Sequence, residues 1–275
     1  MRTRFHFILT AFSLSCFLFT ACGGDKQPAN EENKTATETT AAETPPPAEI
    51  KLTDFTPSPD FPDATISMDY KDGKFMYKVG GTSYKLGEQT PDAPQKMCAN
   101  SGEGQHIHLI IDNEPYIAKY TPQFEQDVAD GEHYILSFLS RSYHESIKTD
   151  KAHTAVKAEV KNKSFVKATP IKDPMLFYSR PKGKYTGKAE TDKVMLDFYP
   201  VNCTLSADGY KVRVSVNNEK DFIINRWTPY FLEGLPMGDN KIKLTLIDKD
   251  GNPVNTPLNP VERVFTLVAD PAPGQ

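Results

Sequence analysis

Polar and apolar residues alternate along several short segments in the second half of the chain. Valine occupies every second position of residues 211–216, and isoleucine or leucine alternates with lysine or threonine through residues 241–246. Residues 262–268 have the pattern of a further strand, and D-K-D-G-N at 248–252 is typical of a tight turn. Because this period of two indicates strands and no segment has a helical pattern, we expect immunoglobulin-like antiparallel sandwich architecture.

The strand pattern occurs twice. When Phe124 is aligned with Phe231, the following residues 131–139 match residues 238–246 without a gap, glycine to glycine and leucine to leucine. Upstream, residues 108–113 match residues 213–218 once a two-residue gap is allowed. The sequence therefore predicts an all-β chain with two tandem immunoglobulin-like antiparallel β-sandwiches, at 51–162 and 165–270, joined near residues 163–174.

The amino-terminal segment has the features of a targeting signal. Arg2 and Arg4 precede an apolar run at residues 5–19, and small residues lead into Cys22. The segment resembles a bacterial lipoprotein signal, which implies cleavage after residue 21 and lipid attachment to Cys22. Gly23 in place of an aspartate then implies the outer membrane. An ordinary secretory signal is the alternative, because phenylalanine stands at 19 where leucine is usual.

Residues 22–50 form the predicted linker between the signal and the body. From 23 to 49 the chain has no aromatic residue and no Leu, Ile, Val or Met, and it has a triple proline at 45–47. Such a segment cannot bury enough apolar surface to offset the entropy lost on ordering. We expect it to be disordered, and to tether the body to the membrane through the amino-terminal lipid.

Histidine is confined almost entirely to the first copy. Apart from His6 in the signal, all the histidines lie there, and the second copy has Lys211 and Arg213 where the first has His106 and His108. Alternation places those two imidazoles on the outward face of one strand, about 6–7 Å apart. This spacing suits a copper or zinc ion, with a third ligand from His144, Glu145 or His133. Alternatively, the histidines are surface residues or hydrogen-bond a covering loop.

Three segments of the first copy carry a family resemblance. They are residues 104–112 (G-Q-H-I-H-L-I-I-D), 130–133 (D-G-E-H) and 142–146 (S-Y-H-E-S), joined in the second copy by 227–230 (W-T-P-Y) and 261–263 (V-E-R). Together they resemble uncharacterised bacterial envelope lipoproteins with His-rich H-L-I-D immunoglobulin-like domains, often labelled phosphopeptide-binding proteins. The resemblance implies an envelope protein with sandwich domains, and it implies no particular chemistry.

The strand at 133–141 is apolar on both faces. Tyr134, Leu136 and Phe138 lie on the face that carries lysine and threonine in the second copy, and Tyr143 follows nearby. These four residues are therefore a candidate binding surface for an envelope protein partner. Packing on the preceding segment or on the other sandwich is the alternative, since exposed apolar patches are uncommon.

Cys98 and Cys203 occupy equivalent places in the two copies. A disulfide would require the two strands to face each other, which tandem sandwiches seldom arrange. We therefore expect a buried free thiol in each core.

Charge and motifs narrow the function. The net charge of −4 provides no basic field for nucleic acid. The chain has no G-x-S-x-G elbow, P-loop, dinucleotide fingerprint or C-x-x-C motif, so we expect no enzyme. The sequence predicts a lipid-anchored cell-envelope protein with a non-catalytic binding or structural role. The alternative function is copper or zinc binding through the histidines of the first copy.

Overall fold

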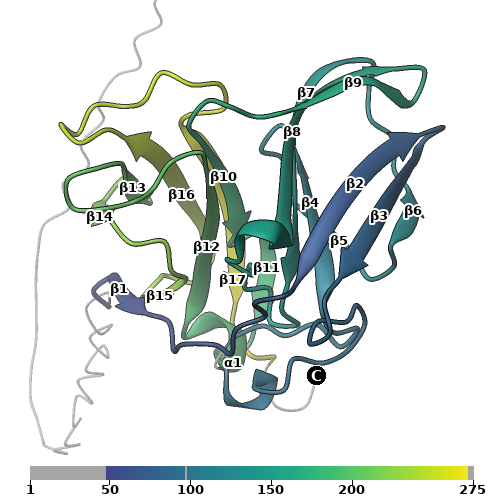
Figure 1. Cartoon of the computed structure of the whole chain (residues 1–275). Coiled ribbons are helices and arrows are strands. Elements are labelled where there is room, and N and C mark those ends of the chain that lie inside the picture. Colours follow the sequence, from purple (N-terminus) through teal and green to yellow (C-terminus); the bar gives the residue numbers. More distant parts are fainter. Residues whose placement is uncertain (1–47, 97, 272–275) are drawn as a thin grey trace, which may run out of the picture. The chain divides into compact units, whose positions relative to one another are not determined.

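The computed structural model describes residues 48–96 and 98–271, whose regular secondary structure is almost entirely β-strand (Figure 1). The predicted signal peptide, the lipidation site Cys22 and nearly all of the predicted linker lie outside these residues. Among the described residues no helix is long and apolar enough to cross a membrane. The helical elements are short: α1 (Lys188–Thr191) and the 3-10 turns Ala93–Gln95 and Asp150–Ala152.

The first sandwich consists of two antiparallel sheets. The smaller sheet has the order β2 (Thr65–Lys71), β3 (Lys74–Gly80) and β6 (Gln123–Glu125). The larger has the order β5 (Ile117–Lys119), β4 (His106–Ile111), β7 (Gly131–Ser140), β8 (His153–Lys161) and β9 (Ser164–Pro170). Alternate apolar residues of both sheets, such as Phe75 and Leu109, fill the core between them.

The second sandwich has the same plan. One sheet has the order β1 (Lys51–Asp54), β15 (Tyr230–Glu233), β12 (Val194–Val201) and β10 (Met175–Arg180). The other has the order β11 (Gly183–Thr186), β17 (Val261–Val268), β16 (Gly238–Ile247), β13 (Lys211–Val216) and β14 (Lys220–Ile224). The predicted all-β, immunoglobulin-like architecture is confirmed, with one departure: β11 runs parallel to β17.

Strand pairing repeats between the two sandwiches. Strand β4 pairs with β7 as β13 pairs with β16, and both ladders have the register that the sequence alignment predicts. The equivalent pairs are Ile107↔Leu139 with Val212↔Leu246, and Ile111↔Ile135 with Val216↔Ile242. Residues at aligned positions therefore have equivalent neighbours along these two ladders.

The predicted boundaries between the copies need two corrections. Strand β1, assigned from sequence to the first sandwich, pairs with β15 of the second, and Leu52 lies opposite Leu232. The predicted joint at residues 163–174 contains β9, which pairs with β8 and extends the larger sheet of the first sandwich. In both places the partner strand supplies the backbone hydrogen bonds that an isolated four- to seven-residue segment lacks.

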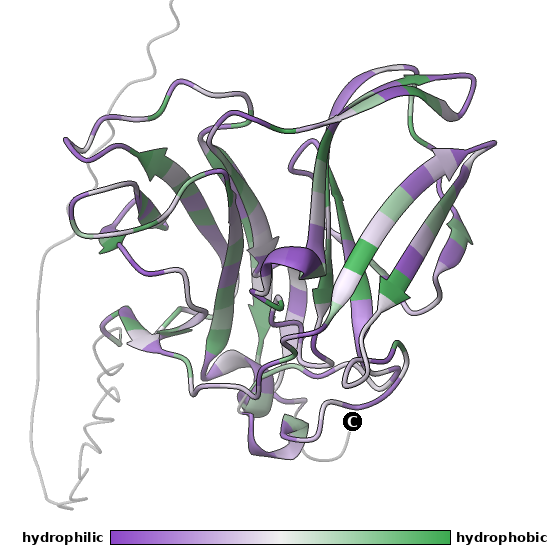
Figure 2. Ribbon diagram, viewed as in Figure 1, coloured by the Kyte–Doolittle hydropathy of each residue, from purple (hydrophilic) through white to green (hydrophobic). Residues whose placement is uncertain are grey.

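The four sheets stack as successive layers, and the two inner sheets contact each other (Figure 1). Successive residues of β10 and β12 point to opposite faces, so Tyr178 and Phe198 enter the core of the second sandwich. Phe177 and Tyr199, on the opposite face, pack against the first sandwich. They belong to what we call the middle core, made of Ile110, Tyr116, Leu136, Phe138, Ile171, Met175, Phe177, Tyr199 and Val201. Figure 2 shows the resulting hydrophobic colouring along β10 and β12.

The middle core overturns the prediction of a partner-binding face. Leu136 and Phe138 are fully buried against the second sandwich, and Tyr134 is half-buried beside them. Tyr143 is also buried, in a separate cluster with Phe55 and Phe231. The second apolar face of β7 exists because another sheet covers it, which is the intramolecular alternative.

Candidate metal centre

Strand β4 places two imidazoles on one face. Ile107 and Leu109 point into the core of the first sandwich, so His106 and His108 point the other way. The predicted outward orientation is confirmed, but the alternative that they are surface residues is wrong, because both residues are 0% exposed. The second sandwich covers this face: Ser179 of β10 has its hydroxyl 3.3 Å from Nδ1 of His108.

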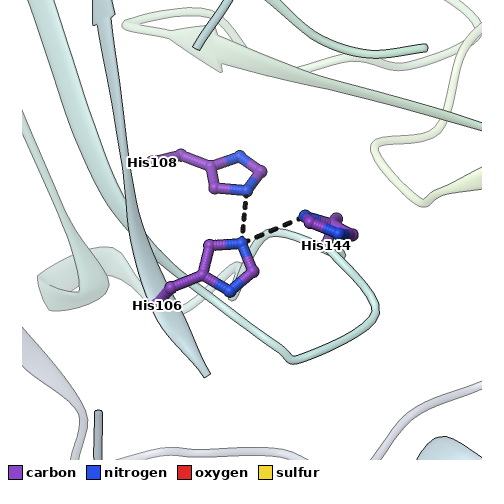
Figure 3. Close-up of side chains that lie close together, drawn as sticks. All are labelled: His106, His108 and His144. Carbon is purple, nitrogen blue, oxygen red and sulfur yellow. Dashed lines mark hydrogen bonds between the residues drawn. The ribbon is translucent and has the colours of Figure 1, made fainter. Parts of the chain in front are cut away.

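His144 joins them from the turn that follows β7. The amide of Arg141 donates to the carbonyl of Glu145, and the amide of His144 donates back to Arg141, both at 2.9 Å. His144 has a φ of +69° within this tight loop. The loop curls over the end of the sheet and directs the His144 ring toward β4, as Figure 3 shows.

The three rings form what we call the histidine cluster. Nε2 of His106 lies 2.8 Å from Nε2 of His108 and 3.1 Å from Nδ1 of His144. One nitrogen from each ring lies within 4.8 Å of the others. Three ligands at 2.0–2.1 Å from a tetrahedral zinc ion are about 3.4 Å apart, so shifts of the order of 1 Å would fit the cluster to an ion.

Neighbouring groups orient these nitrogens. Nδ1 of His106 lies 2.8 Å from the carbonyl of Gly104, which makes Nδ1 the donor; the lone pair of Nε2 then accepts from Nε2 of His108 when no metal is bound. Gly104 has a φ of +85°, and a Cβ there would lie 2.6 Å from the Glu88 carbonyl, so only glycine places that carbonyl correctly. The ring of Tyr116 stacks on His108 at 3.6 Å between centroids.

The cluster is kept uncharged. Burial, together with the nearby cations Arg180 and Lys182, lowers the pKa of His106 to about 4. Burial is also the main reason why the pKa values of His108 and His144 lie well below the usual value. Metal ions bind the neutral imidazole, so the three rings are already in the form that a metal requires.

The other candidate ligands lie elsewhere. Nδ1 of His133 contacts the Asp112 carboxylate at 2.6 Å, near the opposite end of β7 from His144. The carboxylate of Glu145 forms an ion pair with Arg141 at 3.6 Å. Of the three residues proposed from sequence as a third ligand, His144 is the one that joins His106 and His108 among the described residues.

Cys98 and Cys203 are both free, as expected. They are half-buried, and Cys98 packs against the cluster around Tyr143 instead of lying in the core of the first sandwich, which corrects that part of the prediction. Burial raises the pKa of the Cys98 thiol to about 12 and that of Cys203 to about 11. Neither cysteine belongs to the histidine cluster.

Several residues around the cluster were not predicted from sequence. Ser179, Arg180 and Lys182 come from the end of β10 and the residues that follow it, about 70 positions after His108. No spacing rule connects them to the H-x-H motif, because docking of the two sandwiches brings them together. Tyr116 could be noticed as an aromatic residue near the motif, but its stacking on His108 could not.

Comparison with known proteins adds little. No protein-family model matches the chain, and no curated protein matches its sequence. Among solved structures, the fibronectin(III)-like modules of Clostridium thermocellum CbhA align with 11% identity and a TM-score of 0.26, covering 81% of this chain and 95% of theirs. The extracellular domain of the putative hybrid two component system BT3049 from B. thetaiotaomicron aligns with 11% identity and a TM-score of 0.25, covering 78% and 39%.

Proposed function

We propose that this chain is a non-catalytic metal-binding protein of the bacterial cell envelope, which holds one copper or zinc ion through His106, His108 and His144. The convergence of three imidazole nitrogens within 4.8 Å is the observation that carries the proposal. Imidazole is a ligand of choice for both metals, and three histidines form a known zinc ligand set.

Two further features support metal binding. The second nitrogens of His106 and His108 contact the Gly104 carbonyl and the Ser179 hydroxyl, as the outer partners of metal-ligating histidines do. When Nε2 of His108 binds a metal, the ring proton must move from Nε2 to Nδ1. The resulting Nδ1–H can donate a hydrogen bond to the Ser179 hydroxyl. The partner-binding role first expected from sequence has less support, because Leu136, Phe138 and Tyr143 are buried and Tyr134 is half-buried.

The metal content of untagged protein tests the proposal. After equilibration with Zn²⁺ or Cu²⁺ and removal of free metal, we expect about one ion per chain, with saturable binding by calorimetry. His144→Asn removes one ligand at a position where asparagine tolerates the positive φ, and it should abolish stoichiometric binding. His133→Gln, outside the cluster, is the matched control and should bind like the wild type.

A second measurement needs no variant. A ligand of the native state raises the stability by RT ln(1 + [L]/Kd), so metal in excess should raise the melting temperature of the wild type. Sub-stoichiometric binding in the wild type, or equal binding by wild type and His144→Asn, would overturn the proposal.

We also propose that lipid attached to Cys22 anchors the protein, with the body tethered at the outer membrane. The arginine pair, the apolar run and the small residues before Cys22 support this assignment. Cys22→Ser should release the protein from the membrane fraction of expressing cells. Continued fractionation of this variant with detergent-extractable membranes would rule out the anchor.

A further inference from the structure

A buried guanidinium with two unpartnered nitrogen atoms lies next to the histidine cluster. Arg180 is 5% exposed, and its Nε and Nη1 atoms are buried with no hydrogen-bond partner among the described residues. A guanidinium stays charged at all physiological pH values and offers five N–H donors. A buried charge without a counter-charge costs several kcal/mol, so an anion beside Arg180 would stabilise the folded protein.

The nearby carboxylates are already engaged. Asp197 lies opposite Arg180 in the β10–β12 ladder, but its oxygens accept from Ser146 and Lys148 at 3.0 Å. The Glu145 carboxylate pairs with Arg141. The groups that do act on Arg180 are the hydroxyls of Tyr116 and Tyr185 and the thiol of Cys98, none of which is a carboxylate.

A second cation strengthens the positive field. The ammonium of Lys182 donates to the backbone carbonyl of Tyr116 at 2.9 Å and lies 3.9 Å from the centre of its ring. Burial and the charges of Arg180 and Arg263 lower the pKa of Lys182 to about 8. A divalent metal in the histidine cluster would therefore add two positive charges to an environment that is already cationic.

Arg180 and the cluster share neighbours. Tyr116 interacts with Arg180, and its hydroxyl lies 3.2 Å from Nδ1 of His144. Ser179, next to Arg180 in β10, contacts His108. Three histidines leave at least one position open on a tetrahedral metal. Of the groups around the cluster, His144 and Lys182 are partly exposed.

We propose that the metal of the histidine cluster takes a small oxyanion, a carboxylate or a phosphate, as its remaining ligand, and that Arg180 holds this oxyanion. The planar guanidinium fork matches both groups geometrically, and the anion offsets the charges of metal, Arg180 and Lys182 together. The inference rests on the proposed metal binding and deepens it, because it assigns the class of ligand that completes the same site.

Coupling between metal and anion is the first test. If each stabilises the other, calorimetry on the wild type should show Co²⁺ or Zn²⁺ binding at least about tenfold more tightly with acetate or inorganic phosphate than in chloride alone. Separate titrations with acetate and with phosphate identify which oxyanion the site takes. The visible spectrum of the Co²⁺ form should change saturably as that anion is added, since the anion enters the coordination sphere.

Arg180→Met tests the role of the guanidinium. This variant keeps the length and apolar stem of the side chain but has no donors, so it should bind one Co²⁺ and lose at least about tenfold in anion affinity. Without anion it should bind Co²⁺ more tightly than the wild type, because a neighbouring positive charge is gone. Arg213→Met, at the position equivalent to His108 in the second sandwich, is the control and should change neither value.

The outcomes separate the two proposals. One Co²⁺ per chain with a spectrum and affinity insensitive to both anions would overturn the oxyanion site and leave metal binding standing. If Arg180→Met bound the anion as tightly as the wild type, the oxyanion site would likewise be overturned and metal binding would stand. Failure of the wild type to bind Co²⁺ or Zn²⁺ would remove both, and the wild-type anion coupling decides the question even where Arg180→Met does not fold.

Discussion

Burial keeps the imidazole of His106 neutral across the pH range in which a histidine in water takes up a proton. Its pKa in the folded protein is about 4, whereas an unfolded chain has a value near 6.5. Between these two values the unfolded state binds more protons than the folded state. Stability is therefore unaffected by His106 above pH 6.5 and decreases as the pH falls from 6.5 towards 4.

We accordingly expect the metal-free protein to lose about 2 kcal/mol of unfolding free energy from this residue between pH 7 and pH 5. His108 and His144 act in the same direction, because their pKa values are also lowered by burial. Urea denaturation at constant ionic strength measures the loss. His106→Gln lacks this contribution, so its unfolding free energy should fall less steeply with decreasing pH than that of the wild type. An equal pH dependence in the two proteins would contradict the lowered pKa of His106.

The second sandwich provides a natural substitution to try at the same positions. His106→Lys combined with His108→Arg introduces the residues that β13 has, but into a fully buried site beside Arg180. We expect a loss of about 3–5 kcal/mol, since two further charges would be buried without partners. Lys211 and Arg213 are half-buried on the outer face of β13, so the reverse double substitution to histidine should cost about 1 kcal/mol or less.

Site residues within one strand or turn could be predicted from the sequence, whereas residues contributed by the other sandwich could not. Alternation within β4 correctly placed His106 and His108 on one face, and the turn after β7 made His144 a candidate. The burial of the imidazoles and the arrival of Arg180 depend on how one sandwich docks on the other. Periodicity describes which face of a strand is apolar, and it contains no information about which sheet covers the opposite face.

Strand β1 illustrates the same limit at the level of elements. The strands at 211–216, 241–246 and 262–268 could be predicted because each alternates over six or more residues. Strand β1 has four residues, and its partner β15 lies about 180 positions away. A short edge strand of this kind is defined by the ladder that it joins and not by its own pattern.

Phe55, immediately after β1, fixes that strand to the molecule. It is buried against Phe231 of β15 at 4.7 Å between ring centroids and against Tyr143 at 6.1 Å. Phe55→Ala should lower the unfolding free energy by about 3–5 kcal/mol and speed amide exchange in β15. Val264→Ala, at an exposed position of β17, should change stability by about 0.5 kcal/mol or less, and a similar loss in both variants would argue against the role of Phe55.

The four stacked sheets make the two sandwiches one cooperative body. The inner sheet β1-β15-β12-β10 is buried on both faces where β10 and β12 pass between the middle core and the core of the second sandwich. Separating the sandwiches would expose aromatic residues such as Phe138 and Phe177, each of which is fully buried. Neither sandwich can therefore unfold without removing apolar contacts from the other.

We expect a single unfolding transition for the described body. Fluorescence of Trp227, the one tryptophan in the sequence, and far-UV circular dichroism should give coincident curves in urea. Phe177→Ala should move the common midpoint downwards, by about 3–5 kcal/mol in unfolding free energy, and keep the curves together. Two separated transitions in the wild type would show that the sandwiches unfold independently.

The pairing of β1 with β15 also determines which part of the fold bears a pulling force applied to its two ends. A pulling force applied at the amino-terminal end of the described chain enters through β1, and one applied at the carboxyl-terminal end enters through β17. Both strands belong to the second sandwich, so while the four paired residues of β1 hold, that sandwich bears the load. The first sandwich, which contains the histidine cluster, lies outside the path of the applied force until β1 detaches.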